Sequence, residues 1–95
     1  MPKLLIFENA KGTWLFIIFG TDQNENRMHV HVGRKATNHY CKIWLEPDVE
    51  VAAGGDLSHS ELVEVVGLVK EYKSELVAQW KAFMDGKLKM ITVRK

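Results

Sequence analysis

The sequence predicts an α+β fold in which a mostly antiparallel sheet of four or five strands, arranged as a meander, packs one face against a single long amphipathic C-terminal helix. The region up to Ala53 alternates short apolar runs with polar turn residues, as expected of strands joined by loops. A helix-capping pattern follows at Ser58 and Glu61, and apolar residues then recur at a helical period.

The first strands are predicted from apolar runs. Residues 3–7 form a short run followed by a stretch of turn composition, which fits a strand and a hairpin turn. Residues 14–19 are apolar on both faces and rich in aromatic and β-branched side chains, so we expect a central strand covered on both sides and ending at Gly20. The polar residues 21–26 are expected to form an exposed loop.

A predicted β-hairpin over residues 27–45, the histidine hairpin, carries three of the four histidines. Side chains alternate along a strand, so His29 and His31 share one face. If Gly33 lies opposite His39, then His29, His31, His39 and Cys41 gather on that face. A register shifted by one residue separates them, and the sequence leaves both registers open.

The C-terminal half begins with a break at Pro47, after which residues 49–53 are a candidate fifth strand at the sheet edge. The capping box at Ser58 starts the helix, whose apolar stripe consists of Leu62, Val66, Val69, Tyr72, Leu76, Trp80 and Phe83. Gly86 is expected to end the helix. Residues 88–93 are a candidate last strand, followed by a frayed basic tail of Arg94 and Lys95.

The length of this helix leaves two alternatives. At 1.5 Å per residue it would extend ~37 Å, whereas a domain of this size has a radius of gyration of ~12 to 13 Å. Either the helix breaks near Gly67, or its far end with Trp80 and Phe83 packs on another subunit. We favour the second, and therefore expect a homodimer through the long helix.

Composition predicts one domain over residues 1–95 and a soluble protein, since 46% of residues are hydrophobic and 26% charged. The longest apolar run has six residues, too short for a membrane span. A single cysteine, Cys41, excludes an internal disulfide and agrees with a reducing cytoplasm. The net charge of +1 argues against nonspecific binding of polyanions, but residues 27–42 contain four bases and no acid.

Three segments carry a family resemblance: the His29-Val30-His31-Val32 strand, the segment from Lys42 to Pro47, and the helix segment from Glu71 to Trp80. In this order and spacing, the chain resembles a small prokaryotic domain-of-unknown-function family, numbered four-one-six-zero, over most of its length. The resemblance implies a small cytoplasmic protein that is toxin-antitoxin-like and binds a protein partner, with action on RNA also implied. The partner is expected to be antitoxin-like or, from the long helix, a second copy of the chain. The stretch before the histidines departs from many relatives, which carry prolines there.

The basic hairpin suggests a nucleic-acid site. Histidine titrates near neutral pH, so His29 and His31 are candidate catalytic residues for general acid and base, with Lys42 stabilising phosphate charge. The alternatives are RNA binding without cleavage and an ordinary solvent-facing role for the two histidines. The candidate nucleic-acid-binding residues are Arg27, His29, His31, Arg34, Lys35 and Lys42.

A metal site is the main alternative. His29 and His31 place two imidazoles on one side of a strand, and His39, Cys41, Asp22 or Glu25 could complete the coordination. Two histidines are weak evidence for zinc, so we expect no cofactor. The sequence thus predicts a protein that binds a partner protein or RNA through the histidine hairpin. A small metal-binding domain is the alternative, and a metal-independent ribonuclease is a more distant one.

Overall fold

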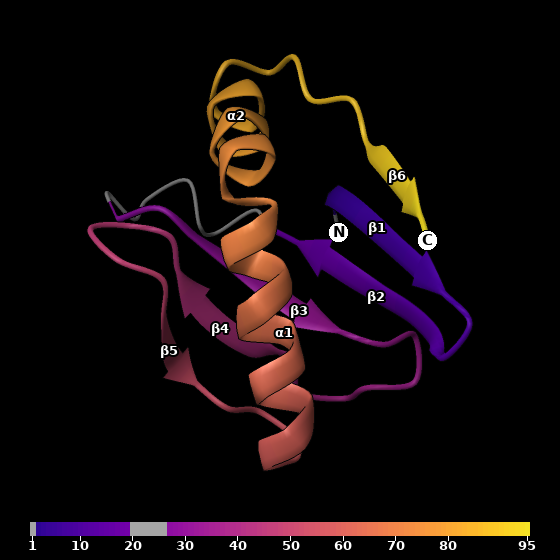
Figure 1. Ribbon diagram of the computed structural model, residues 1–95. Helices are drawn as coiled ribbons and strands as arrows, with labels where there is room; N and C mark the ends of the chain where they lie inside the picture. Colours follow the sequence, from indigo (N-terminus) through magenta and orange to yellow (C-terminus); the bar gives the residue numbers. More distant parts are fainter. Residues whose placement is uncertain (1, 20–26) are drawn as a thin grey trace.

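The computed structural model describes residues 2–19 and 27–95 (Figure 1). The strands and helices follow one another as β1 (Lys3–Asn9), β2 (Gly12–Ile17), β3 (His29–Gly33), β4 (Cys41–Trp44), β5 (Glu50–Ala53), α1 (His59–Glu71), α2 (Lys73–Met84) and β6 (Ile91–Arg94). The strands form one six-stranded sheet of order β5-β4-β3-β2-β1-β6. Neighbouring strands from β1 to β5 are antiparallel, whereas β6 runs parallel to β1.

The α+β class is confirmed, but the predicted meander of four or five strands is wrong. After α2 the chain returns to the sheet and adds β6 beside β1 in parallel, with Leu5 opposite Ile91. The predicted frayed tail is also wrong, because Arg94 belongs to β6 and its Nε lies 3.0 Å from a carboxylate oxygen of Glu8. The backbone N–H of Lys95 donates to the Glu8 carbonyl at 2.8 Å. The sheet is therefore mixed.

The prediction of one long helix is wrong as well. The helix breaks at Tyr72, where φ is −103° and ψ is 21°, rather than at Gly67, which lies inside α1. A single straight helix over residues 59–84 would be about 39 Å long, which exceeds the longest extent of the molecule, 33 Å. Because of the break, α2 folds back on the chain's own sheet, and Trp80 is only 5% exposed. The helical region therefore does not extend beyond the sheet, and the expectation of a homodimer through an overhanging helix loses its basis.

The start and end of the helical region follow the sequence pattern. The Ser58 side chain accepts a hydrogen bond from the Glu61 backbone N–H, and the Glu61 carboxylate accepts one from the Ser58 backbone N–H, so the capping box is confirmed. Beyond α2, Gly86 adopts a φ of 70°, which only glycine accommodates without strain.

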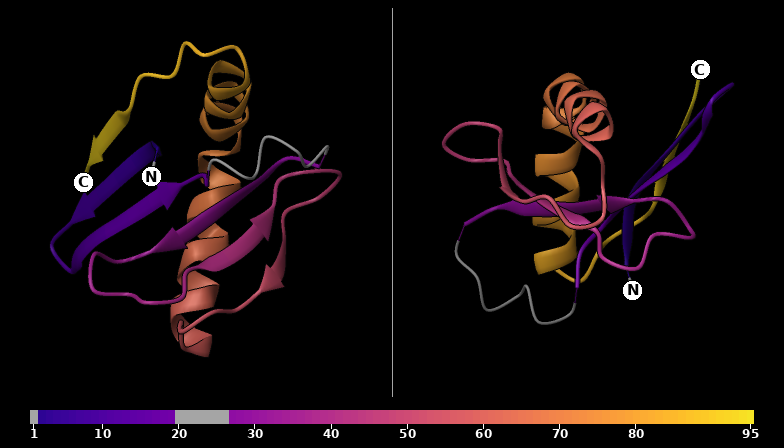
Figure 2. Two further views of the ribbon diagram at one scale, coloured as in Figure 1. Left: turned by 180° about the vertical axis from the view of Figure 1, so that it is seen from behind. Right: turned by 90° about the horizontal axis from the view of Figure 1, so that it is seen from below.

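The hydrophobic core lies between α1 and one face of the sheet. Val30, Val32 and Ile43 of β3 and β4 are fully buried there, together with Val65 and Val69 of α1. Figure 2 shows α1 over one face, and the view from behind shows the opposite face of the sheet with no helix in front of it. The described residues include no helix with the length and hydrophobicity needed to span a membrane.

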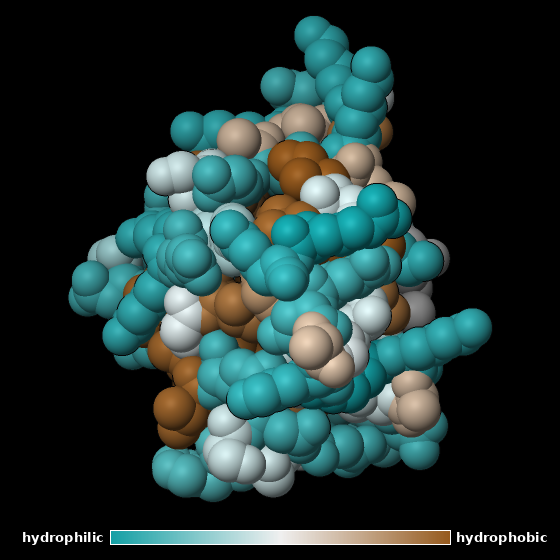
Figure 3. Space-filling view, turned by 45° about the vertical axis from the view of Figure 1, so that its right-hand side comes forward, coloured by the Kyte–Doolittle hydropathy of each residue, from teal (hydrophilic) through white to brown (hydrophobic). Residues whose placement is uncertain are grey.

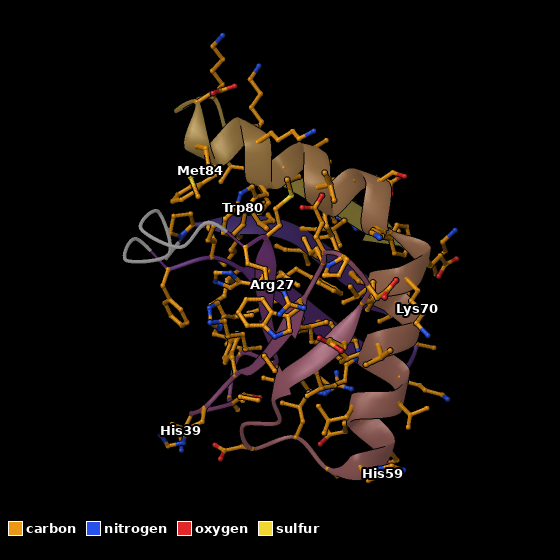
Figure 4. The ribbon with its side chains drawn as sticks, turned by 90° about the vertical axis from the view of Figure 1, so that its left-hand side faces the viewer. Arg27, His39, His59, Lys70, Trp80 and Met84 are labelled. Carbon is orange, nitrogen blue, oxygen red and sulfur yellow. The ribbon has the colours of Figure 1, made fainter. Side chains whose placement is uncertain are left out.

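The second helix crosses the ends of the strands instead of lying along α1, as Figure 4 shows. Gln79 holds it there, because its side-chain amide donates to the Leu4 carbonyl at 2.6 Å and also to the carbonyl of Lys89. One buried side chain thus connects α2 with β1 and with the segment that leads into β6. Seen from the side between α1 and β6, the surface is mostly hydrophilic with hydrophobic patches between (Figure 3).

Candidate functional site

The register of β3 and β4 decides which side chains share a face. His29 lies opposite Trp44, and His31 lies opposite Lys42. Paired residues project to the same side, so these four form one surface, the histidine face, directed away from α1. This register differs by one residue from the one that would collect three histidines and Cys41. Instead of a histidine and cysteine cluster, it places an indole and an ammonium group beside the imidazoles.

His29 is a packing residue at one end of this face. It is fully buried, and its Nδ1 donates to the Arg27 carbonyl at 2.9 Å. Its ring centroid lies 4.9 Å from that of Trp80, 5.6 Å from that of Trp44 and 5.2 Å from that of His31. Because Trp80 of α2 covers it, His29 lies out of reach of a dissolved ligand. It joins β3 to α2 through edge-on ring contacts.

Trp44 has cations close to its ring. The guanidinium carbon of Arg27 lies 4.2 Å from the ring centroid, and Nζ of Lys42 lies 4.5 Å from it. Each distance is within the range of a cation–π interaction. Arg27 is held in place, since its Nε donates to the Glu46 carbonyl at 2.6 Å and its Nη2 forms an ion pair with Glu50 at 2.9 Å. Figure 4 shows Arg27 below Trp80.

His31 lies next to this cationic indole and is half-buried. Its ring meets that of Phe19 at a centroid distance of 4.5 Å and an interplanar angle of 62°. Ring contacts therefore run without interruption from Phe19 through His31 and His29 to Trp44. The histidine face is thus an aromatic surface with cations at one side of it.

Arg34 and Lys35 were predicted to share the site, but the structure places Arg34 elsewhere. Its guanidinium carbon lies 3.8 Å from the centroid of Trp14, a core residue, and its Nη1 donates to the Thr13 carbonyl at 3.2 Å. Its Nε also lies 3.9 Å from a carboxylate oxygen of Glu61 in α1. Arg34 therefore covers the core on the α1 side of the sheet. Lys35 is exposed in the turn between β3 and β4.

The remaining metal-ligand candidates do not come together. His39 is exposed in the loop before β4, with its Nδ1 3.3 Å from Asp56, and Cys41 is buried in the core. Burial raises the pKa of the Cys41 thiol to about 11, which keeps it protonated. In the part of the chain that the structure describes, no three His, Cys, Asp or Glu residues lie close enough to hold a metal ion. Asp22 and Glu25 lie outside the described residues.

The roles of Phe19 and Gln79 were not predicted, although the position of each in the sequence indicates its role. Phe19 lies two residues beyond Ile17, which pairs with His31, so strand alternation predicts that Phe19 faces the histidines. Gln79 is three residues after Leu76 and next to Trp80, on the apolar side of the helix. A single amide in such a stripe indicates that a buried backbone group needs a partner.

Comparison with known proteins identifies a family. The model of the family described as "Domain of unknown function (DUF4160)" matches residues 12–81, most of the chain. No curated protein and no solved structure matches it. The matched range contains β2 to β5, α1 and most of α2, and hence the whole histidine face. The family resemblance is confirmed.

Proposed function

The chain belongs to the Domain of unknown function (DUF4160) family, and we propose that it binds single-stranded RNA through the histidine face. The toxin-antitoxin-like role and the protein partner are supported by the family resemblance, and a cytoplasmic location is supported by the resemblance and by the single cysteine. RNA binding has additional support in the geometry of β3 and β4.

The observation that carries the proposal is the combination of Lys42, Trp44 and His31 on adjacent strands of a sheet face that α1 leaves open. Proteins that bind single strands use aromatic rings on which bases stack and cations that follow the phosphates. Here the ammonium group of Lys42 lies 4.5 Å from the Trp44 ring centroid, so a base at the ring edge brings its phosphate within reach of the cation. Residues 27–42 contain no acid, and the carboxylate of Glu50, which lies opposite Trp44 on β5, is already paired with Arg27.

The geometry favours binding over cleavage. Cleavage by a pair of histidines needs both imidazoles in contact with the ribose and the leaving oxygen. His29 is buried under Trp80 and cannot make that contact, whereas His31 is only half-buried. In this proposal His29 and Arg27 position Trp44, and the ligand contacts are made by His31, Lys42 and Trp44.

Binding is tested by fluorescence anisotropy with a labelled octamer of uridine at several salt concentrations. We expect a Kd of roughly 10–100 µM, typical of a few stacking and phosphate contacts. Lys42→Gln should weaken binding about tenfold and reduce the slope of log K against log salt by ~0.7, the value for one phosphate contact on a single strand.

The matched control is Lys35→Gln, which removes the same charge from the turn at the far end of β3. It should leave both the affinity and the slope within error of the unmodified protein. If Lys35→Gln and Lys42→Gln weaken binding equally, then attraction is diffuse and the histidine face is not the site. If the unmodified protein does not bind the octamer at low salt, the proposal is wrong.

A further inference from the structure

An apolar groove lies between α1 and the edge strand β5, on the side of the sheet opposite the histidine face. Its volume is about 450 Å³, and Val51 of β5 forms one wall. The other wall is the flank of α1, formed by Leu62, Val63, Val66 and Gly67. Val51 is 42% exposed and Val63 is 61% exposed, so two large apolar side chains are open to solvent there.

Two features show that this groove has room for a chain. A Cβ added at Gly67 would find no atom within 4 Å, so the groove is open above the middle of the helix. The edge beside it is also open, because among the described residues β5 pairs only with β4 and lies at the end of the sheet. An exposed edge strand presents unpaired backbone N–H and C=O groups that an extended peptide can bond.

The charge that lines the groove is basic. Lys70 lies at one end and His59 at the other, and no acid is among the described residues that line the groove. Two acids close to β5, Glu50 and Asp56, contact Arg27 and His39 instead. Figure 4 looks onto this side, with His59 at the beginning of α1 and Lys70 near its end. The groove therefore suits a partner that carries a carboxylate.

We propose that the groove binds an extended peptide segment of a partner protein, which adds as an antiparallel strand to β5, inserts alternate apolar side chains against Val51 and Leu62, and places an acidic C-terminal end at Lys70. The antiparallel direction continues the pairing of β5 with β4. β5 leads into the start of α1, so the two run in opposite directions, and an antiparallel peptide ends near Lys70 (Figure 1). From His59 to Lys70 the helix rises about 16 Å, the span of about five extended residues.

The test uses two acetylated hexapeptides of the same composition, in which threonine alternates with valine or leucine. The first ends in aspartate with a free carboxylate, and the second has the aspartate first and an amidated end. Titration of ¹⁵N-labelled protein should give saturable shifts at Val51, Leu62 and Val66 with the first peptide at a Kd below about 1 mM. The second peptide should bind at least fivefold more weakly.

Single substitutions then test the charged contact and the apolar contact of the peptide separately. Lys70→Glu should weaken the first peptide about tenfold, whereas Lys81→Glu on α2 should leave its affinity unchanged. Gly67→Leu should fill the groove and abolish the shifts, and an unchanged circular dichroism spectrum shows that this variant folds.

Three outcomes would overturn the proposal. One is the absence of saturable shifts with the first peptide at 1 mM, and another is equal affinity for both peptides. The third is a concentration-dependent dimer in sedimentation that Gly67→Leu abolishes, which assigns the groove to a second copy of this chain.

Discussion

Replacing Gln79 by Met tests how α2 is fixed to the sheet. The substitution retains the length of the side chain but removes the two N–H donors that bond the carbonyl oxygens of Leu4 and Lys89. Gln79 is only 7% exposed, so water cannot easily replace its amide. A buried acceptor left without a donor costs about 1–3 kcal/mol. We therefore expect a loss of about 2–4 kcal/mol in the free energy of unfolding.

The loss is large compared with the total, because a chain of this length is stable by about 5–14 kcal/mol. Urea denaturation followed by tryptophan fluorescence measures it. With a slope near 1–1.5 kcal/mol per molar urea, the midpoint should fall by about 2 M. A decrease below about 0.5 kcal/mol would refute the argument, since surface substitutions have effects of that size.

Tyr72→Phe is the matched control for Gln79→Met. It also removes one polar group from the helical region, but the buried Tyr72 hydroxyl has no hydrogen-bond partner among the described residues. Its removal therefore breaks no bond and relieves an uncompensated desolvation. We expect the variant to be as stable as the unmodified protein or up to about 1 kcal/mol more stable. Equal destabilisation by both variants would show that volume, and not hydrogen bonding, sets the effect.

Three further predictions concern α1 and the core. Gly67→Ala should raise the free energy of unfolding by about 1 kcal/mol, visible as a higher Tm, because an added Cβ meets nothing within 4 Å and alanine favours the helix. The buried Cys41, with its pKa raised to about 11, should react with a thiol reagent at pH 8 only after denaturant is added. The hydrogen bond from the Ser58 backbone lowers the pKa of Glu61 from 4.5, so its stabilising effect is present above that pH and lost as the pH falls through the lowered pKa. Urea denaturation from pH 6 to pH 3 should therefore show a smaller loss of stability in Glu61→Gln than in the unmodified protein.

Local signals in the sequence predicted local structure well. The capping box of Ser58 and Glu61 is a bonding pattern within four residues, so the start of α1 needs no tertiary information. Alternation along β3 likewise predicts that His29 and His31 share a face. The family resemblance depended on similarly short motifs and is confirmed by the match over residues 12–81.

Features that depend on distant contacts could not be predicted. The register of the hairpin changes partners with a shift of one residue, and the loop between the strands does not specify it. The helix breaks at Tyr72 rather than at the poorer helix former Gly67, because the break lets Trp80 pack on His29 and Gln79 reach Leu4. The parallel strand β6 depends on the return of the chain after α2, which no local pattern indicates.

The predicted site is divided between two parts of the fold for the same reason. Arg34 and Lys42 are close in the sequence, and charge alone assigns both to one basic surface. Trp14 stacks with Arg34, and Glu61 attracts it to the α1 side, while alternation along β4 directs Lys42 to the histidine face.

Titration of the ¹⁵N-labelled protein with the uridine octamer locates the surface that binds RNA. We expect saturable shifts at His31 and Lys42 and at the indole N–H of Trp44, with the amides of Arg34 and Lys35 unchanged. Shifts confined to Arg34 and Lys35, or no shifts at RNA concentrations well above 100 µM, would contradict it.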